Sequence, residues 1–234
     1  MQIVILAGGL ATRLRPLTEK MPKSMVLVEG KPFMEYQIEL LKGQGVTDIV
    51  MCIGYLGEKI KDYFQDGERF GVRIRYSEEK DRLLGTAGAI KNAEPLLAEH
   101  FFVTYGDSFL MLDYGKIACY FERFDKLGLM VVYKNYNRWD RSNVVVEGNL
   151  VKVYDKKTQL PGMDCIDEGL SILRRRALAM LRPRKVRSLD DFYQGLIEAG
   201  ELLAFETQQR FYEIGSPAGL EEFRQLISTG GVPA

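Results

Sequence analysis

Residues 2–18 read QIVILAGGLATRLRPLT: an apolar run, a glycine pair and then two arginines. Residues 2–6 have the composition of a buried strand. Because Gly8 and Gly9 carry no Cβ, backbone N–H groups at that point can approach a ligand closely. Residues 1–31 contain five basic and two acidic side chains, in a chain whose formal net charge is 0. A glycine loop with concentrated positive charge at a strand end indicates a polyphosphate site.

This loop carries neither of the two common phosphate-binding patterns. The sequence has no G-x-x-x-x-G-K-[ST], and no G-x-G-x-x-G that follows a strand and opens a helix. The P-loop and dinucleotide-binding fingerprints are therefore excluded. The alternative interpretation is a glycine turn beside a solvated basic face, because such turns are common in α/β proteins.

Short apolar runs alternate with helix-period segments through the first half of the chain, which predicts a doubly wound, mostly parallel sheet. The second half adds a hairpin that turns at residues 147–149. We expect one domain over residues 1–229 and a flexible tail over 230–234. The predicted strands are 2–6, 48–53, 72–76, 101–105, 128–134, 143–147, 150–154, 166–173, 202–206 and 211–214, and the predicted helices are 32–43, 56–64, 86–97, 174–182, 189–199 and one from Pro217.

The composition is that of a globular protein, with 46% hydrophobic and 27% charged residues among 234. No global field recruits nucleic acid or an anionic membrane, because 32 basic residues balance 32 acidic ones. No apolar run approaches the ~20 residues of a membrane span, and the N-terminus lacks the basic segment of a secretory signal. Cys52, Cys119 and Cys165 lie far apart in apolar surroundings, which predicts reduced core thiols and a cytoplasmic location.

Two acidic residues lie at predicted strands, and Asp107 is expected at the same edge of the sheet as the glycine loop. Asp107 comes directly after strand 101–105, and Glu213 lies on the late strand 211–214. A metal held here needs oxygen ligands, because His100 is the only histidine, and oxygen ligands indicate Mg²⁺ rather than zinc. The alternatives are an aspartate that caps the next segment and a surface glutamate.

Four motifs, taken in order, resemble those of the sugar-1-phosphate nucleotidyltransferases, also called nucleotide-sugar pyrophosphorylases. The resemblance runs from residue 1 to about residue 227 and implies a Rossmann-like (GT-A-type) three-layer α/β sandwich with a mostly parallel mixed sheet. Ala11 stands where glycine is usual in this family, and Ser24 stands where proline is usual. The motifs are residues 6–18 with Pro22-Lys23, Gly85-Thr86-Ala87-Gly88, Gly106-Asp107 and residues 212–217, YEIGSP.

The resemblance implies a reaction in which a sugar 1-phosphate attacks the α-phosphorus of a nucleoside triphosphate and releases pyrophosphate. No covalent intermediate is required. Positioning and charge neutralisation carry most of such a reaction between polyanions. By resemblance, Arg13, Lys23 and Asp107 are catalytic, and Asp107 and Glu213 hold Mg²⁺ as Lewis acid and template. The implied nucleotide-binding residues are Leu6, Ala7, Gly8, Gly9, Thr12, Arg13, Lys23, Glu78, Gly85, Thr86 and Ala87, and the implied sugar-phosphate residues are Gly106, Lys156, Glu168 and Gly169.

The loop SEEKDRLLGTAG, residues 77–88, is expected to choose the base. Guanine offers two adjacent N–H donors that one carboxylate can accept, whereas uracil and thymine suit an amide better. The loop contains Glu78 and Glu79 but no glutamine, so GTP is favoured. Resemblance to the mannose- and heptose-1-phosphate guanylyltransferases favours heptose or mannose 1-phosphate as acceptor. Such a product serves lipopolysaccharide, capsule or S-layer glycans.

Other functions stay open at this stage. Uridylyl or cytidylyl transfer to a sugar 1-phosphate or another small phosphate is one alternative, and a non-catalytic nucleotide-binding regulatory homologue is another. A glycosyltransferase is disfavoured, because no second acid follows Asp107 in an Asp-x-Asp pattern. A homodimer is compatible with the sequence, and neither nucleic acid nor membrane is expected as a partner.

Three further features have structural interpretations. The basic segment 174–187 is interpreted as the solvated face of a helix, or as charge balanced by Asp190 and Asp191, rather than as an anion, nucleic-acid or membrane contact. Lys156 has the alternative of a plain hairpin-surface lysine. Trp139, near Tyr133 and Tyr136, is interpreted as a partly buried loop anchor, with a sugar site or a subunit contact as the alternatives.

Overall fold

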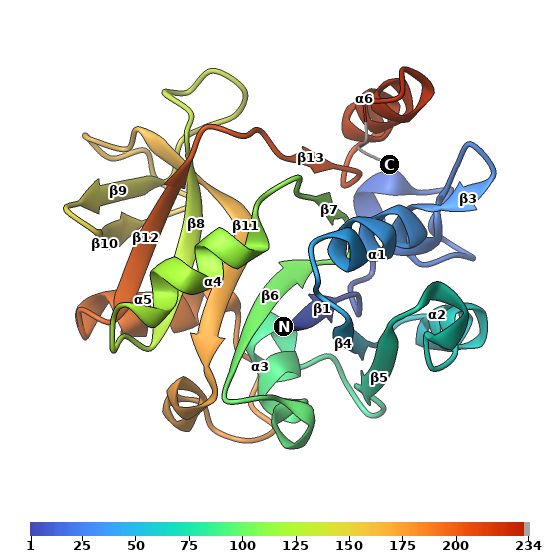
Figure 1. Ribbon diagram of the computed structural model, residues 1–234, viewed down its shortest axis with the longest axis horizontal. Coiled ribbons are helices and arrows are strands. Elements are labelled where there is room, and N and C mark those ends of the chain that lie inside the picture. Colours follow the sequence, from blue (N-terminus) through green and yellow to red (C-terminus); the bar gives the residue numbers. More distant parts are fainter. Residues whose placement is uncertain (232–234) are drawn as a thin grey trace.

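The computed structural model describes residues 1–231, and within them nine strands form a central sheet (Figure 1). Across the sheet the strand order is β5-β4-β1-β6-β11-β8-β12-β10-β9. The strands are β1 (Gln2–Leu6), β4 (Asp48–Ile53), β5 (Arg73–Glu78), β6 (His100–Tyr105), β8 (Gly128–Lys134), β9 (Val144–Glu147), β10 (Leu150–Tyr154), β11 (Cys165–Arg174) and β12 (Leu202–Thr207).

The sheet is mixed, but most of its strands run the same way. β1 pairs in parallel with β4 and β6, β4 with β5, and β8 with β12. β11 runs antiparallel to β6 and β8, and β10 runs antiparallel to β12 and β9. Only β10 and β11 therefore oppose the common direction in the described sheet. The predicted mostly parallel mixed sheet is confirmed.

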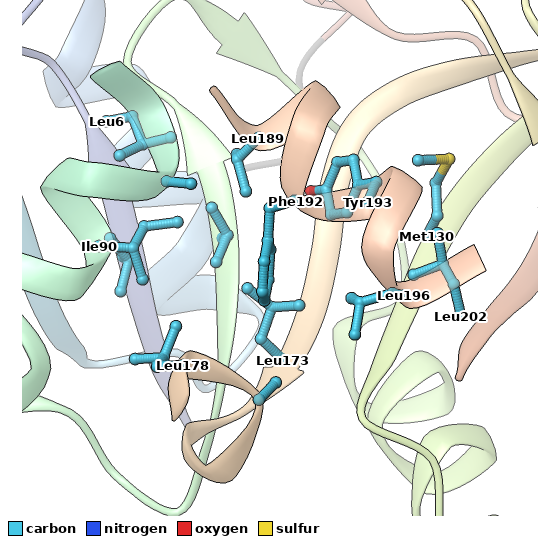
Figure 2. Close-up of a cluster of buried hydrophobic side chains, with 14 of the residues drawn as sticks. Leu6, Ile90, Met130, Leu173, Leu178, Leu189, Phe192, Tyr193, Leu196 and Leu202 are labelled. Atoms are coloured by element: carbon cyan, nitrogen blue, oxygen red, sulfur yellow. The ribbon is translucent and has the colours of Figure 1, made fainter. Parts of the chain in front are cut away.

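The two faces of the sheet are covered by different helices, which makes three layers (Figure 1). One face buries the apolar sides of α1 (Phe33–Gly43), α2 (Gly57–Phe64) and α4 (Tyr114–Glu122). The other face buries those of α3 (Gly85–Asn92) and α5 (Leu189–Glu198), together with the 3-10 helix η5 (Arg175–Met180). Figure 2 shows Ile90, Leu178, Phe192 and Leu196 gathered over this second face.

The strands β1 and β4 are almost entirely apolar because both of their faces are covered. In β1, Val4 and Leu6 face the α3–α5 layer, whereas Ile3 and Ile5 face the α1–α2–α4 layer. β4 alternates in the same way. A parallel strand buried on both faces requires a continuous apolar run rather than an alternating one, which is the pattern that residues 2–6 display.

A small outlying unit brings the late carboxylate back to the sheet. The strand β13 (Tyr212–Glu213) pairs with β7 (Ser108–Phe109), and α6 (Pro217–Ser228) packs beyond them (Figure 1). Phe223 of α6 meets Phe33 and Phe109 edge to face, with ring centroids 4.8 and 5.0 Å apart. Such aromatic pairs contribute about 1 kcal/mol each beyond area burial. The unit therefore fixes Glu213 beside the residues that follow β6.

Several predicted elements differ from the observed ones. The helix predicted over 86–97 ends at Asn92, and a 3-10 turn, η4 (Glu94–Leu96), follows it where Pro95 interrupts the helix. The helix predicted over 174–182 is the shorter η5. The sequence analysis missed α4 altogether, although Asp113 caps it by accepting a hydrogen bond from Lys116 N at 2.8 Å. The remaining short elements are η1 (Thr12–Leu14), η2 (Lys23–Met25), η3 (Glu68–Phe70), β2 (Leu27–Val28) and β3 (Lys31–Pro32).

The predictions for the cysteines and the tail are only partly met. Cys52 and Cys165 are buried free thiols, but Cys119 is exposed on α4, so its assignment to the core was wrong. The α4 helix buries Ile117 and Phe121 and presents Cys119 on its opposite side. Gly230 and Gly231 donate backbone hydrogen bonds to the last turn of α6, and the rest of the predicted tail lies outside the described residues. No described helix is long and apolar enough to cross a membrane.

Candidate active site

The glycine loop after β1 lies against the neighbouring strands. A Cβ on Gly8 would come within 2.8 Å of Glu79 Oε2 and 3.2 Å of the Gly54 backbone nitrogen, so a side chain there would have to displace its neighbours. Ala11 has φ 49° and ψ 42°, in the left-handed region that glycine adopts freely. This conformation costs an alanine about 1 kcal/mol. It explains why glycine is usual at this position in the resembling family, and the chain still follows the same path with alanine.

Lys23 and Asp107 meet in front of this loop. Lys23 begins η2, Asp107 follows β6, and the Lys23 ammonium forms an ion pair with Asp107 Oδ2. Their side chains are 22% and 17% exposed, so the pair is largely sheltered from solvent. Gly106 N donates to Leu6 O at 2.9 Å, which joins the ends of β6 and β1. The two residues therefore lie at the same sheet edge as the glycine pair.

Asp107 and Glu213 point at the same spot. Glu213 pairs with Ser108 in the β7–β13 ladder, and Ile214 N donates to Asp107 O at 2.9 Å. A Cβ on Gly215 would lie 2.2 Å from Glu213 Oε2 and 3.2 Å from Asp107 Oδ2. A side chain at Gly215 would fill the space between the carboxylates, so the glycine keeps that space open.

This pair of carboxylates fits magnesium. Mg²⁺ is usually held by one or two protein carboxylates, with substrate phosphates and water completing the shell. In the part of the chain that the structure describes, no group of three or more His, Cys, Asp or Glu side chains could hold a metal ion. The donor set therefore suits a metal that is completed by a nucleotide rather than one caged by protein alone.

Two neighbouring cavities meet at this point. The first, of about 320 Å³, is called here the nucleotide cavity, and the second, of about 510 Å³, the sugar-phosphate cavity. Their shared lining residues are Arg13, Tyr105 and Asp107. Of the predicted nucleotide-binding residues, the first cavity is lined by Leu6, Ala7, Gly8, Gly9, Arg13, Lys23, Gly85 and Thr86. Three of the four predicted sugar-phosphate residues line the second cavity: Lys156, Glu168 and Gly169. The fourth, Gly106, lines the first cavity.

The carboxylate that faces the nucleotide cavity is Glu79, not Glu78. Glu79 lines the cavity, and its Oε1 accepts a hydrogen bond from Leu84 N at 2.6 Å. Burial raises the pKa of Glu79. Glu78 is paired with Lys61 at 2.7 Å outside the cavity, and this hydrogen bond lowers the pKa of Glu78. The assignment of Glu78 to the nucleotide is therefore corrected, because successive side chains at a strand end point to opposite faces.

Two other predicted nucleotide residues do not line either cavity. Thr12 is exposed on η1. Ala87 is fully buried and donates its backbone N–H to Arg187 O at 3.0 Å. Its neighbour Thr86 accepts a hydrogen bond from Leu189 N at 2.7 Å, so the start of α5 supports the loop from behind. Ala87 therefore shapes the cavity without facing it.

Lys156 belongs to a charged network rather than to a plain hairpin surface. Its ammonium lies 3.2 Å from Asp190 Oδ1 and 3.7 Å from Asp167 Oδ2. The Tyr154 hydroxyl lies 2.9 Å from both carboxylates. Asp190 directly follows Leu189, which binds Thr86. The first turn of α5 thus contacts both the nucleotide loop and the lysine of the sugar-phosphate cavity.

Sequence reasoning missed Tyr105, Asp167 and Asp190 as members of the site. Tyr105 lines both cavities, and its position directly before Gly106-Asp107 was an available signal. The aspartates carried no signal of their own, because their roles depend on how α5 and β11 meet Lys156. In the basic segment 174–187, Arg187 lies 3.8 Å from Asp191 and Arg176 pairs with Asp125, whereas Asp190 pairs with Lys156 and not with this segment as predicted.

Glu168 is a buried acid without a partner. It is 1% exposed, and neither carboxyl oxygen has a hydrogen-bond partner in the structure. Burial, together with the charge of Asp167, raises the pKa of Glu168 to about 9. At neutral pH the group is therefore protonated and can donate a hydrogen bond to a ligand hydroxyl. Its neighbour Gly169 has φ 77°, and a Cβ there would lie 3.2 Å from the Tyr105 ring.

Glu168→Gln should change the pH dependence of stability. The folded chain keeps the Glu168 proton up to about pH 9, whereas the unfolded chain loses it near 4.5. Between these values the folded state binds more protons, so the free energy of unfolding of the wild type falls as pH rises. The amide has no proton to lose, so the stability of the variant relative to the wild type rises by at most about 1.4 kcal/mol per pH unit. Urea unfolding at pH 5, 6, 7 and 8 measures this difference, and parallel curves for the two proteins would contradict it.

Comparison with known proteins identifies relatives along nearly the whole chain. Residues 2–153 match a family model described as nucleotidyl transferase. The chain is 31% identical over 225 residues to the D-glycero-alpha-D-manno-heptose 1-phosphate guanylyltransferase of Campylobacter jejuni, covering 95% of this chain and 98% of that protein. It is also 31% identical to mannose-1-phosphate guanyltransferase beta-A of Xenopus laevis, over 93% of this chain but only 62% of that longer protein.

Other relatives act on a different nucleotide or provide a structure. The UTP–glucose-1-phosphate uridylyltransferase of Synechocystis is 40% identical over 124 residues, which cover 48% of this chain and 32% of that protein. The crystal structure of HddC from Yersinia pseudotuberculosis, complexed with GMP-PN, superposes with a TM-score of 0.82 at 30% identity, covering 97% of this chain and 99% of that one. The expected Rossmann-like fold and the resemblance to sugar-1-phosphate nucleotidyltransferases are both confirmed. The chain belongs to the nucleotidyl transferase family and is a nucleotidyltransferase enzyme.

Proposed function

We propose that this enzyme transfers the guanylyl group of GTP to a heptose- or mannose-type sugar 1-phosphate and releases pyrophosphate, in the cytoplasm. The observation that carries the proposal is the shared wall between the two cavities, formed by Arg13, Tyr105 and Asp107. A triphosphate in one cavity and a sugar phosphate in the other would meet at that wall. Residues 1–229 would act as one catalytic domain, because both cavities are built on the same central sheet.

The residues at the wall supply charge and position. Arg13 would neutralise the leaving pyrophosphate, and Lys23 would bridge the reacting phosphates. Lys156, held between Asp167 and Asp190, would bind the phosphate of the incoming sugar. Orientation and preorganised charge account for most of the acceleration in phosphoryl-type transfers. The oxygen of the sugar phosphate would displace pyrophosphate directly, so no residue of the chain needs to be a nucleophile.

Asp107 and Glu213 would hold Mg²⁺, which when bound supplies Lewis-acid polarisation of a phosphoryl oxygen and a fixed template. In the structure Asp107 is paired with Lys23. This pairing orients the carboxylate before substrates arrive. Gly215 N donates to Glu213 Oε2 at 2.9 Å, and Ser216 Oγ lies 3.3 Å from Glu213 Oε1, which orients the second carboxylate.

Glu79 is the group that would select guanine. It lines the nucleotide cavity beside Gly8, and a carboxylate accepts the two adjacent N–H donors of guanine. The relatives that use a guanine nucleotide by name agree with this choice, whereas the uridylyltransferase relative does not. Because that relative matches about half of the chain, the base requires its own test.

Glu79→Gln should weaken the use of GTP more than that of UTP. The amide keeps the size of the side chain but loses a charged acceptor, and hydrogen bonds to charged groups contribute about 1.5–3 kcal/mol. We expect kcat/KM for GTP to fall by about 10- to 100-fold, with a smaller change for UTP. Glu78→Gln is the matched control, because Glu78 pairs with Lys61 outside the cavity. Equal losses for the two variants would contradict the assignment of Glu79.

The reaction itself is tested by pyrophosphate release. The enzyme is incubated with Mg²⁺, each of GTP, UTP, CTP, dTTP and ATP, and a panel of hexose and heptose 1-phosphates. Release with GTP and a heptose or mannose 1-phosphate supports the proposal. Pyrophosphate release only with another triphosphate would show that the enzyme uses a base other than guanine. Silence across the panel, with nucleotide binding retained, favours a regulatory nucleotide-binding protein instead.

A further inference from the structure

A third cavity, of about 360 Å³, adjoins the sugar-phosphate cavity, and no step of the proposed reaction uses it. It lies between the loop after β8, the segment before β13 and the start of α6. The residues that line both cavities are Asp140, Ile166, Phe211 and Glu213. The two cavities are therefore next to each other at Phe211 and Asp140.

Trp139 forms one wall of the third cavity and is 61% exposed. The interpretation of Trp139 as a partly buried anchor is therefore wrong. The loop that carries it is ordered by polar contacts instead: Asn135, which is fully buried, donates to Ser142 Oγ at 3.1 Å and accepts from Trp139 N at 3.2 Å. These bonds hold the loop without burying the indole ring, whose face contacts Arg210.

Arg210 also lines the third cavity, where it lies over the Trp139 ring, and two contacts fix its guanidinium. The group lies 4.1 Å from the centroid of the Trp139 ring. It also makes a two-pronged ion pair with Glu222 of α6, at 2.5 and 2.9 Å. A guanidinium held in this way is preorganised and still has N–H donors to offer, since Arg carries five.

The chemistry of this cavity suits a polyol. An aromatic face packs against C–H groups, while a guanidinium and the Asp140 carboxylate can donate and accept hydrogen bonds to hydroxyls. An additional phosphate is disfavoured, because Asp140, Glu213 and Glu222 surround the single arginine. Among the parts of a sugar phosphate, this cavity therefore suits a hydroxyl-bearing carbon chain better than a phosphate.

We propose that the third cavity is a subsite for the exocyclic carbon chain of the sugar, so that Trp139 and Arg210 select a seven-carbon over a six-carbon acceptor. This inference rests on the proposed function. D-glycero-D-manno-heptose differs from mannose by one extra hydroxymethylene carbon at the exocyclic end. The subsite gives that carbon and its hydroxyl an aromatic face and a charged donor, which mannose 1-phosphate reaches less fully.

The test compares two acceptors on four proteins. With GTP and Mg²⁺, kcat/KM is measured for D-glycero-D-manno-heptose 1-phosphate and for mannose 1-phosphate, using the wild type, Trp139→Ala, Trp139→Phe and Arg210→Ala. We expect the wild type to have the higher kcat/KM for the heptose 1-phosphate. In both alanine variants the ratio of the two kcat/KM values should fall by about tenfold, which is within the discrimination that one carbon of a substrate provides. Trp139→Phe keeps an aromatic face and should keep most of the preference for the heptose. Because Trp139 is exposed, its truncation leaves the core intact.

The ratio of the two acceptors separates a subsite from a general effect. A loss of stability or of metal binding lowers both rates together and leaves the ratio unchanged. An unchanged ratio in both alanine variants, or a wild type without preference, overturns the subsite while leaving guanylyl transfer intact. A wild type that uses neither acceptor overturns the proposed function and the subsite with it.

Discussion

Replacing Lys23 with alanine should lower kcat by about 10²- to 10³-fold, which is the loss seen when one preorganised charge donor is removed from an active site. The Lys23 ammonium is paired with Asp107 next to the wall between the two cavities, and it is largely sheltered from solvent. In that position it would stabilise charge that develops between the reacting phosphates. Initial rates of pyrophosphate release at saturating GTP and sugar 1-phosphate measure the effect.

Lys31→Ala is the matched control for Lys23. Lys31 also pairs with a carboxylate, Glu39, at 2.6 Å, but it lies outside the three cavities described above. Exposed ion pairs contribute less than about 1 kcal/mol, so this variant should keep the wild-type rate. A Lys23→Ala enzyme that turns over as fast as Lys31→Ala would mean that Lys23 is merely a surface charge.

Asp107→Asn should remove Mg²⁺-dependent turnover and leave the fold intact. The amide replaces one of two converging carboxylates, and a neutral oxygen is a much poorer partner for a divalent cation. The backbone carbonyl of Asp107 accepts a hydrogen bond from Ile214 N, which joins the two segments. The substitution changes only the side chain and leaves this hydrogen bond in place. We expect kcat to fall by about 10³-fold, at the upper end of the range for losing one active-site electrostatic contact.

Magnesium titrations of the turnover rate test the loss of metal dependence in Asp107→Asn, and thermal unfolding tests whether the fold is intact. The wild type should show a saturable Mg²⁺ dependence that the variant lacks, while the two proteins unfold at similar temperatures. Asp125→Asn is a suitable control, because Asp125 is 82% exposed and pairs only with Arg176 on the surface. Full activity of Asp107→Asn would exclude Asp107 as a metal ligand.

The parts of the site that follow central strands could be predicted from the sequence. Gly8 and Asp107 come directly after apolar runs, and the ends of parallel strands share one sheet edge. Their proximity therefore follows from the alternation of strands and helices alone. Glu213 was harder, because its strand pairs with β7 outside the main sheet, and only the resemblance of the motif YEIGSP pointed to it.

Other parts of the site could not be predicted, because the positions of their side chains depend on strand register and on contacts between distant segments. Glu78 and Glu79 are adjacent and identical in type, so the sequence cannot tell which faces the cavity; the pairing of Ile53 with Glu78 decides it. The charged network at Lys156 forms only because α5 packs beside β10. Its partner Asp190, in the first turn of α5, is 34 residues further along the chain than Lys156. Trp139 was interpreted as a partly buried loop anchor because aromatic side chains are usually buried to a large extent, whereas local polar bonds hold its loop and leave the ring 61% exposed.

The central claim is that the two substrates react directly with each other where the nucleotide cavity meets the sugar-phosphate cavity. Arg13, Tyr105 and Asp107 line both cavities at that point. The stereochemical course of the reaction tests this most directly, using one diastereomer of GTP with sulfur at the α-phosphorus and D-glycero-D-manno-heptose 1-phosphate as acceptor. A single direct displacement predicts a GDP-sugar with inverted configuration at that phosphorus. Retention of configuration would require a covalent nucleotidyl-enzyme and would contradict the account, and so would the absence of any GDP-sugar.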